Sequence, residues 1–307
     1  MDEDTAKNII KLYRDGHSLR QISKVLHGTI GRERVRQLLH ASRVGLRGRG
    51  AKYRPPQHLT SAERTRLAEL LGYLYGDGHL TRNKNGNHGL FDCVLTFAAN
   101  EPDLVERALT ITEDLYGFRP RVKKYGGWTC VKFRRSFAKY LQEIGYPAGK
   151  KSMCNPRAPL DLLPTKEDRV AFIRGFLNAE ASVHKSVFVH QSVRISATPT
   201  RVARARAVGK NTILKGKPCT FVAWSAAAEI FADNTSSSRI LTDLSTLLRG
   251  IGIPSTVKPI RAYIGFSGVT SVHFELRIRR QHLKTVADLR LVDSTKKQEK
   301  LNQLLRG

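Results

Sequence analysis

The sequence predicts an α+β protein made of two similar halves that follow a small N-terminal helical segment. Three observations predict this fold class. A capped helix that ends in an acidic residue occurs twice, the segments after the two helices correspond in order, and both halves contain alternating apolar and polar residues, typical of strands with one buried face. The predicted boundaries are 1–45 for the helical segment, 46–59 for a basic linker, 60–164 for the first half and 165–307 for the second half.

The charge balance restricts the partners of the protein. The 307 residues include 53 Lys and Arg but only 26 Asp and Glu, a formal net charge of +27. This excess favours a polyanion, nucleic acid before a membrane surface. We find no signal-peptide pattern, no run of about 20 apolar residues able to cross a membrane, and no C-x-x-C pair for a cysteine-bound zinc. We therefore expect a DNA-containing compartment, such as the cytoplasm of a prokaryotic cell.

The N-terminal segment is typical of three short helices with apolar residues at helical spacing. In the third helix, Arg32, Arg34 and Arg36 lie outside the apolar face, as in a recognition helix whose side chains contact DNA. SLRQISKVL followed by RERVRQLL resembles the helix-turn-helix of sigma-factor and resolvase-type DNA-binding domains. The alternative is an ordinary three-helix cap with a solvated basic face.

The duplication is clearest at the two capped helices. Thr60 and Thr165 begin capping boxes, and the helices that follow end in Asp77 and Glu180, 17 and 15 residues after their threonines. Further along, LTFAAN corresponds to EIFADN, and VKFRRSFAKYLQEIGYPAGKK corresponds to LRIRRQHLKTVADLRLVDSTKK. Each half is therefore predicted to contain a helix, a strand pair, a second helix, a second strand pair and a closing helix.

Small residues predict that the two capped helices pack closely. Gly72 and Gly76 are four residues apart and share one face of the first helix, and Gly175 and Ala179 share one face of the second. Faces with few side-chain atoms let two helix backbones approach each other.

Close packing would bring Asp77 and Glu180 together at the C-terminal ends of their helices. Like-charge repulsion and the helix dipoles disfavour two carboxylates there. A cation that prefers oxygen ligands, such as Mg²⁺, would relieve both effects. The alternative is that the helices merely pack and the acids are surface residues.

LLGYLYGDG (70–78) and FIRGFLNAE (172–180) resemble the two signature helices of single-chain LAGLIDADG homing endonucleases, and the resemblance covers 60–307. It implies a monomer with two pseudo-symmetric αββαββα halves, whose sheets form saddles over the major groove of a long asymmetric DNA site. It also implies that Asp77 and Glu180 bind Mg²⁺ or Mn²⁺ and activate water to hydrolyse one phosphodiester per strand. Such nucleases make the double-strand break that intron homing requires.

The sequence departs from the family pattern at three positions. Ala181 follows the second acid where the family usually has Gly, so the backbone there must avoid the left-handed region. Tyr75 and Asn178 stand where an acid often precedes the metal ligand by two residues. We expect these two side chains to matter little, because they lie within the helices.

Family members also place a basic residue near each acid. Lys150 and Lys151 close the first half, and Lys296 and Lys297 close the second half at the matching place. One lysine of each pair is expected to stabilise charge on the attacked phosphate or to position water. A solvated run of charge is the alternative.

Basic residues interleaved with apolar ones predict strands with one face on the core and one on phosphates. We also predict that the extra basic portion at 190–218, which the first half lacks, extends the DNA contact. The predicted DNA-binding residues outside the N-terminal segment are Arg82, Arg121, Lys123, Arg134, Arg194, Arg201, Arg277 and Arg279.

The same resemblance is consistent with two other classes of protein. One is a transcription regulator that binds double-stranded DNA but has lost cleavage. The other is an RNA maturase that assists intron splicing, for which RNA is the partner and the acids are not needed.

Overall fold

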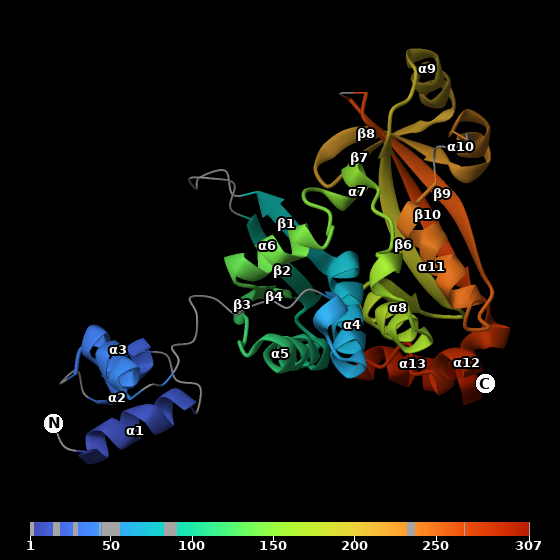
Figure 1. Ribbon diagram of the computed structural model, residues 1–307. Helices are drawn as coiled ribbons and strands as arrows, with labels where there is room; N and C mark the ends of the chain where they lie inside the picture. The colour runs from blue at the N-terminus through green and yellow to red at the C-terminus, as the bar shows by residue number, and fades with distance from the viewer. Residues whose placement is uncertain are drawn as a thin grey trace. The chain divides into compact units, whose positions relative to one another are not determined.

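The computed structural model describes residues 3–14, 19–26, 30–42, 44, 56–82, 91–231, 237–266 and 268–306. The chain divides into two compact units, Met1–Lys52 and Tyr53–Gly307, which are described separately (Figure 1). Of the predicted linker at 46–59, residues 46–55 lie outside the described residues. No helix in the described ranges is long and apolar enough to cross a membrane.

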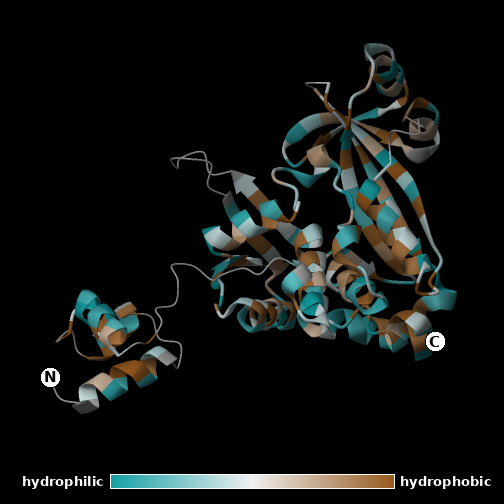
Figure 2. Ribbon diagram, in the orientation of Figure 1, coloured by the Kyte–Doolittle hydropathy of each residue, from teal (hydrophilic) through white to brown (hydrophobic). Residues whose placement is uncertain are grey.

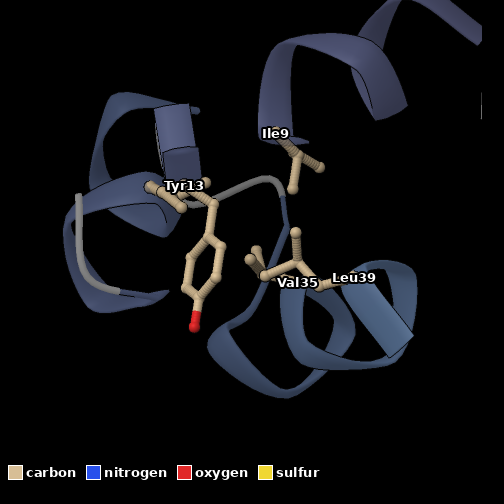
Figure 3. Close-up of a cluster of buried hydrophobic side chains, with 5 residues drawn as sticks. Ile9, Tyr13, Val35 and Leu39 are labelled. Carbon is tan, nitrogen blue, oxygen red and sulfur yellow. The ribbon is translucent and has the colours of Figure 1, made fainter. Parts of the chain in front are cut away.

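The N-terminal unit contains three helices, α1 (Glu3–Arg14), α2 (Leu19–Val25) and α3 (Arg32–Ala41). Each of them contributes apolar side chains to one buried cluster, four of which are labelled in Figure 3. The members of the cluster are Ile9, Tyr13, Ile22, Val35 and Leu39. Burial of these side chains from all three helices stabilises the unit.

The basic residues of α3 lie away from this cluster. Arg32 and Arg34 are exposed, and the Arg36 guanidinium lies 3.1 Å from the Glu33 carboxylate on the same helix. A basic outer face on a three-helix unit is thus present, and the helix-turn-helix assignment stays a prediction.

The larger unit confirms the predicted α+β class, with two antiparallel sheets and the helices that cover them. The first half contains α4 (Ser61–Asp77), β1 (Gly78–Arg82), β2 (Phe91–Ala98), α5 (Pro102–Tyr116), β3 (Arg121–Tyr125), β4 (Trp128–Lys132) and α6 (Arg135–Glu143). Its strands form a four-stranded sheet in the order β1-β2-β4-β3. Helices α5 and α6 pack against this sheet.

The second half repeats this order and adds to it. It contains α8 (Lys166–Glu180), β5 (Ala181–Val183), β6 (Val187–Ile195), α9 (Pro199–Val208), β7 (Lys210–Leu214), β8 (Lys217–Ala223), α10 (Trp224–Phe231), α11 (Arg239–Arg249), β9 (Ser255–Gly265), β10 (Thr270–Ile278), α12 (Leu283–Asp288) and α13 (Thr295–Arg306). The sheet order is β5-β6-β10-β9-β8-β7. Figure 2 shows hydrophobic and hydrophilic residues alternating along the long strands.

Short helical pieces complete the unit: the 3-10 helices Pro56–His58, Leu160–Leu162 and Arg280–His282, and helix α7 (Lys151–Cys154) between the halves. The extra hairpin β7–β8 and the helices α9 and α10 have no counterpart in the first half. The predicted extra portion at 190–218 begins too early, because 190–195 belong to β6, a central strand that pairs with β10. Its remainder contains α9, β7 and the start of β8, and the β7–β8 hairpin extends the second sheet beyond β9.

Helices α4 and α8 lie side by side between the two sheets (Figure 1). Both expected capping boxes form at their first turns, on Thr60 and Thr165. The buried Asp168 carboxylate closes the box of α8 and also accepts hydrogen bonds from Arg64 Nε at 3.0 Å and Thr65 Oγ1 at 2.9 Å on α4. The N-terminal turns of the two helices are therefore fastened to each other.

The small residues of both helices lie in the contact between them. A Cβ atom on Gly72 would lie 2.3 Å from the carbonyl oxygen of Phe172, and one on Gly175 would lie 2.1 Å from the carbonyl oxygen of Glu69. A Cβ on Gly76 would lie 2.5 Å from the Cβ of Ala179. At Gly72 and Gly175 the contact is made by backbone against backbone, which leaves no room for a side chain.

One side of the helix pair is charged and the other is apolar. Glu69 is 2% exposed, and the Arg107 guanidinium from α5 donates to both of its carboxylate oxygens at 2.8 and 2.9 Å. Arg174 of α8 lies 3.8 Å from the same carboxylate. Glu69 lies three residues before Gly72, and the equivalent residue of α8, three residues before Gly175, is Phe172. The Phe172 ring packs edge-on against Tyr75 with a centroid distance of 5.8 Å.

We expect Gly175→Ala to lower the free energy of unfolding by about 1–3 kcal/mol, because overpacking forces the two backbones apart. Denaturant unfolding measures the change. Gly127→Ala is the matched control, since Gly127 lies in the β3–β4 turn and no atom stands within 4 Å of an added Cβ. Equal unfolding midpoints for the two variants would contradict the close backbone contact.

Candidate active site

Asp77 and Glu180 are the last residues of α4 and α8. The next residues, Gly78 and Ala181, have nearly equal extended conformations, with φ of −77° and −76°. Neither exit uses the left-handed region, so Ala181 takes the place of glycine without changing the path of the chain. Both helices lead straight into the first strand of their sheet.

The two carboxylates lie in one electrostatic environment. Burial raises the pKa of Asp77 to about 7, and the negative charge of Glu180 is the second cause. Burial also raises the pKa of Glu180, although the Lys151 ammonium and a hydrogen bond from Gln191 act in the opposite direction. The paired helix ends therefore bring the two acids close enough to influence each other.

The second lysine of each predicted pair reaches this place. Lys151 Nζ donates a hydrogen bond to the carbonyl oxygen of Tyr75 at 3.0 Å, and Lys297 Nζ donates to the carbonyl oxygen of Asn178. Tyr75 and Asn178 each precede the acid of their helix by two residues, so the two halves make the same contact. Burial lowers the pKa of both lysines, and the nearby carboxylates act against that shift.

The first lysine of each pair, Lys150 or Lys296, is exposed. The sequence alone left the choice open within each pair. The structure places Lys151 and Lys297 beside the acids and leaves their neighbours at the surface.

The expectation that Asn178 matters little was wrong. This fully buried side chain accepts hydrogen bonds from the backbone N–H groups of Asp293 and Ser294 at 3.0 and 3.1 Å, and it donates to the Asp293 carboxylate. Those contacts fix the turn that leads into α13, which carries Lys297. Asn178 therefore positions the lysine of its own half.

The two acids do not have the same neighbours. Gln191 Nε2 on β6 donates to Glu180 Oε1 at 2.9 Å. Gln191 lies two residues after Val189, the strand partner of Ala181. The equivalent residue of the first half, two residues after the strand partner of Gly78, is Phe97, which is buried with its ring edge-on to Tyr73. Only the Glu180 side has a polar side chain at this position. Sequence analysis missed Gln191, because no motif marks it and its place depends on the strand register.

Contacts between the halves hold the lysine of the second half. Glu101, at the N-cap of α5, lies 3.7 Å from Lys297 Nζ. Asp103 on the same helix accepts hydrogen bonds from Thr295 N at 2.7 Å and Thr295 Oγ1 at 3.1 Å, at the start of α13. Glu101 also raises the pKa of Asp77, as the last of several causes. The first half thus contributes to the surroundings of both acids.

The predicted DNA-binding residues of the strands fall on the face of each sheet that is turned away from its helices. Arg121 and Lys123 are exposed on β3. Arg194 and Arg277 are exposed on β6 and β10, and the Arg277 guanidinium lies 5.3 Å from the ring centroid of Phe188.

The other predicted DNA-binding residues lie elsewhere. Arg134 is the N-cap residue of α6, with its guanidinium 4.6 Å from the Phe118 ring centroid. Arg279 precedes the 3-10 helix Arg280–His282, and Arg201 lies in the first turn of α9, on the extra segment. Arg82 ends β1, and its side chain lies outside what the structure describes.

The two carboxylates at the helix ends are donors of the type that a hard cation prefers. Among the described residues, no three His, Cys, Asp or Glu side chains are grouped so that they could hold a metal ion. Two carboxylates remain, Asp77 and Glu180, and Mg²⁺ is usually bound by one or two carboxylates together with water. The same donors do not suit a structural zinc ion, which takes four protein ligands.

The sequence matches no protein-family model and no curated protein. Similar solved structures include full-length WhiA from Thermatoga maritima, with 11% identity over 82% of this chain and 63% of that chain and a TM-score of 0.34. Another is the N-terminal LAGLIDADG domain of WhiA, with 11% identity over 80% of this chain and 91% of that chain and a TM-score of 0.33. A third is the LAGLIDADG homing endonuclease I-GzeII in complex with its DNA target, with 9% identity over 78% of this chain and 88% of that chain and a TM-score of 0.33. Similarities of this size do not place the chain in a family.

The raised pKa of Asp77 predicts a pH-dependent stability in the absence of metal. With a folded pKa of about 7 against the usual 3.8, the folded protein retains a proton that the unfolded chain releases. The free energy of unfolding should therefore fall as pH rises from about 4 to 7. Asp77→Asn removes this loss and should be more stable than the wild type at pH 7.5, by at most about 4 kcal/mol at 1.36 kcal/mol per pKa unit.

Urea unfolding of both proteins at several pH values, with a chelator present, measures the difference. The gain should shrink toward pH 4 and vanish below about pH 3, where Asp77 is protonated in the unfolded chain as well as in the folded protein. A difference that does not change between pH 4 and pH 8 would exclude the raised pKa.

Proposed function

We propose that the chain is a site-specific DNA endonuclease that makes a metal-dependent double-strand break in a long asymmetric target. The observation that carries the proposal is the doubled arrangement at the helix ends. Each half supplies one carboxylate, Asp77 or Glu180, and one lysine, the partly buried Lys151 or the buried Lys297, whose ammonium group is hydrogen-bonded to the carbonyl oxygen two residues before the acid. Two related sites on one helix pair suit the cleavage of two antiparallel strands.

The surface supports double-stranded DNA as the substrate. The formal net charge is +27, and basic residues are exposed on the faces of both sheets that are turned away from the helices. Arginine and lysine on such a face bind phosphates and release counterions, which gives salt-dependent affinity. The basic helix α9 and the hairpin β7–β8 extend the second sheet and would lengthen the bound segment of DNA.

The side chains suit phosphodiester hydrolysis. Asp77 and Glu180 would hold Mg²⁺ or Mn²⁺, which when bound lowers the pKa of a water molecule and offsets negative charge on the attacked phosphate. The ammonium groups of Lys151 and Lys297 are fixed by their hydrogen bonds to backbone carbonyls. In this proposal they would stabilise the charge that develops on the phosphate oxygens, without reorganisation during the reaction.

The two sites are not equivalent. Glu180 has Gln191 as a hydrogen-bonding neighbour, whereas the place beside Asp77 is occupied by Phe97. A hydrogen-bond donor fixes the orientation of the carboxylate that it contacts. One strand should therefore be cut before the other, and nicked DNA should accumulate before linear DNA.

Asp77→Asn and Glu180→Gln should each abolish the double-strand break and leave DNA affinity within about threefold, since neither carboxylate is needed for contact with phosphates. The assay is Mg²⁺-dependent cleavage of a plasmid that carries the host DNA sequence without the inserted mobile element. The supercoiled, nicked and linear forms of the plasmid are quantified over time. Lys151→Ala should slow cleavage in the same assay, because it removes the ammonium group at the end of α4. Lys150→Ala is its control, because Lys150 is exposed and Lys151 is the member of the pair that contacts the helix end.

Linear product from either acid variant at the wild-type rate would exclude the assigned site. Tight, salt-sensitive DNA binding without cleavage at any metal concentration would instead favour a transcription regulator. Preferential binding of RNA would favour a maturase.

Removal of Met1–Lys52 should weaken DNA binding and flatten its salt dependence while cleavage persists. The slope of log affinity against log salt should fall by about 0.9 for each phosphate that the shortened protein no longer binds. Titration of binding at several salt concentrations measures the slope, and substitution of Arg32, Arg34 and Arg36 by Ala in the full chain should reproduce part of the change. A truncated protein that folds but no longer cleaves would assign the N-terminal unit to the catalytic body.

A further inference from the structure

The second sheet has one face of buried side chains and one face of accessible side chains, which we call the open face of the second sheet. Along β10 the buried residues alternate with accessible ones, and the accessible ones lie on the open face. Its basic members on the long strands are Arg194 of β6, Lys258 and Arg261 of β9 and Arg277 of β10. Glu275, also on the open face, is the only acidic residue in the six strands of this sheet.

Glu275 stands among positively charged or protonatable groups. In the strand register its direct neighbours are His190 on β6 and Lys258 on β9. Its carboxylate lies 3.9 Å from His190 Nε2, and its side chain is 14% exposed. Within the described residues, no lysine or arginine forms an ion pair with it.

The acid in the first sheet differs in this respect. Asp92 is the only acidic residue in β1, β2, β3 and β4, and its carboxylate lies 3.7 Å from Lys132 Nζ and 3.9 Å from Arg135 Nε. Its charge is offset by two permanent cations of its own half. Glu275 lacks this compensation and keeps its acceptor oxygens available.

A carboxylate on a phosphate-binding face is repelled by DNA unless it meets a hydrogen-bond donor. In the major groove the donors are the amino groups of cytosine N4 and adenine N6. The adenine donor has the N7 acceptor beside it, which repels a carboxylate, and guanine presents only acceptors. Cytosine is therefore the base edge that Glu275 matches best.

We propose that Glu275 is a specificity-determining residue that accepts a hydrogen bond from the N4 amino group of a cytosine in the major groove of the bound DNA. This inference rests on the proposed function, because it takes the open face of the second sheet as a DNA contact. It adds the identity of one base pair and the residue that reads it.

The experiment selects binding sequences from duplexes with a long random segment, in the presence of a chelator so that no cleavage occurs. The wild type should enrich a cytosine at one position, and Glu275→Gln should change the preference at that position alone. A glutamine amide pairs with N6 and N7 of adenine, so the expected replacement is adenine, with discrimination changed by about 5- to 100-fold. All other positions should stay the same.

Glu143→Gln is the matched control. It makes the same change in net charge on α6, where Glu143 is exposed and lies 3.6 Å from Lys139, and its preferred sequence should equal that of the wild type. Glu275→Asp keeps the charge but withdraws the carboxylate by one methylene, so it should keep cytosine with weaker discrimination. If the circular dichroism of Glu275→Gln shows misfolding, Glu275→Asp decides.

Unchanged preferences in a folded Glu275→Gln variant, or in Glu275→Asp if the glutamine variant misfolds, would overturn the inference and leave DNA binding intact. A wild-type protein that enriches no sequence and binds no duplex would overturn the proposed function, and the inference with it.

Discussion

The backbone contact between α4 and α8 is the constraint on which the rest of the larger unit depends. At Gly72 and Gly175 each helix lies directly against the main chain of the other. That closeness sets how far apart the helix ends lie, and therefore how strongly Asp77 and Glu180 interact. Because each helix leads directly into the first strand of its sheet, the same contact also fixes where the two sheets begin.

The charged groups at the helix ends balance each other. Two carboxylates and two ammonium groups lie partly buried at one place, and either pair alone would be strongly disfavoured there. Burial raises the pKa of the acids and lowers that of the lysines, so each kind of group shifts toward its neutral form. The hydrogen bonds that hold the ammonium groups keep this balance in a defined geometry.

Much of the fold could be predicted from the sequence, because its signals are local. The capping boxes at Thr60 and Thr165 and the glycine spacing of the two helices are visible without any tertiary information. Gln191 and Asn178 could not be predicted in the same way. Gln191 reaches Glu180 only through the pairing of β5 with β6, and Asn178 acts on a turn more than 100 residues away in the chain. The choice between Lys150 and Lys151 likewise depends on which side chain the packed core buries.

The unequal sides of the helix pair determine which helix can partner which. Glu69 of α4 is compensated by Arg107 of its own half and by Arg174 of α8. If α4 met α4 of another copy, Leu71 would occupy the place of Arg174, and a buried carboxylate would be left with one cation in place of two. Exchange of helices between molecules is thus discouraged by charge as well as by shape. The differences between the two duplicated helices therefore favour the pairing of α4 with α8 within one chain over the pairing of two copies of α4.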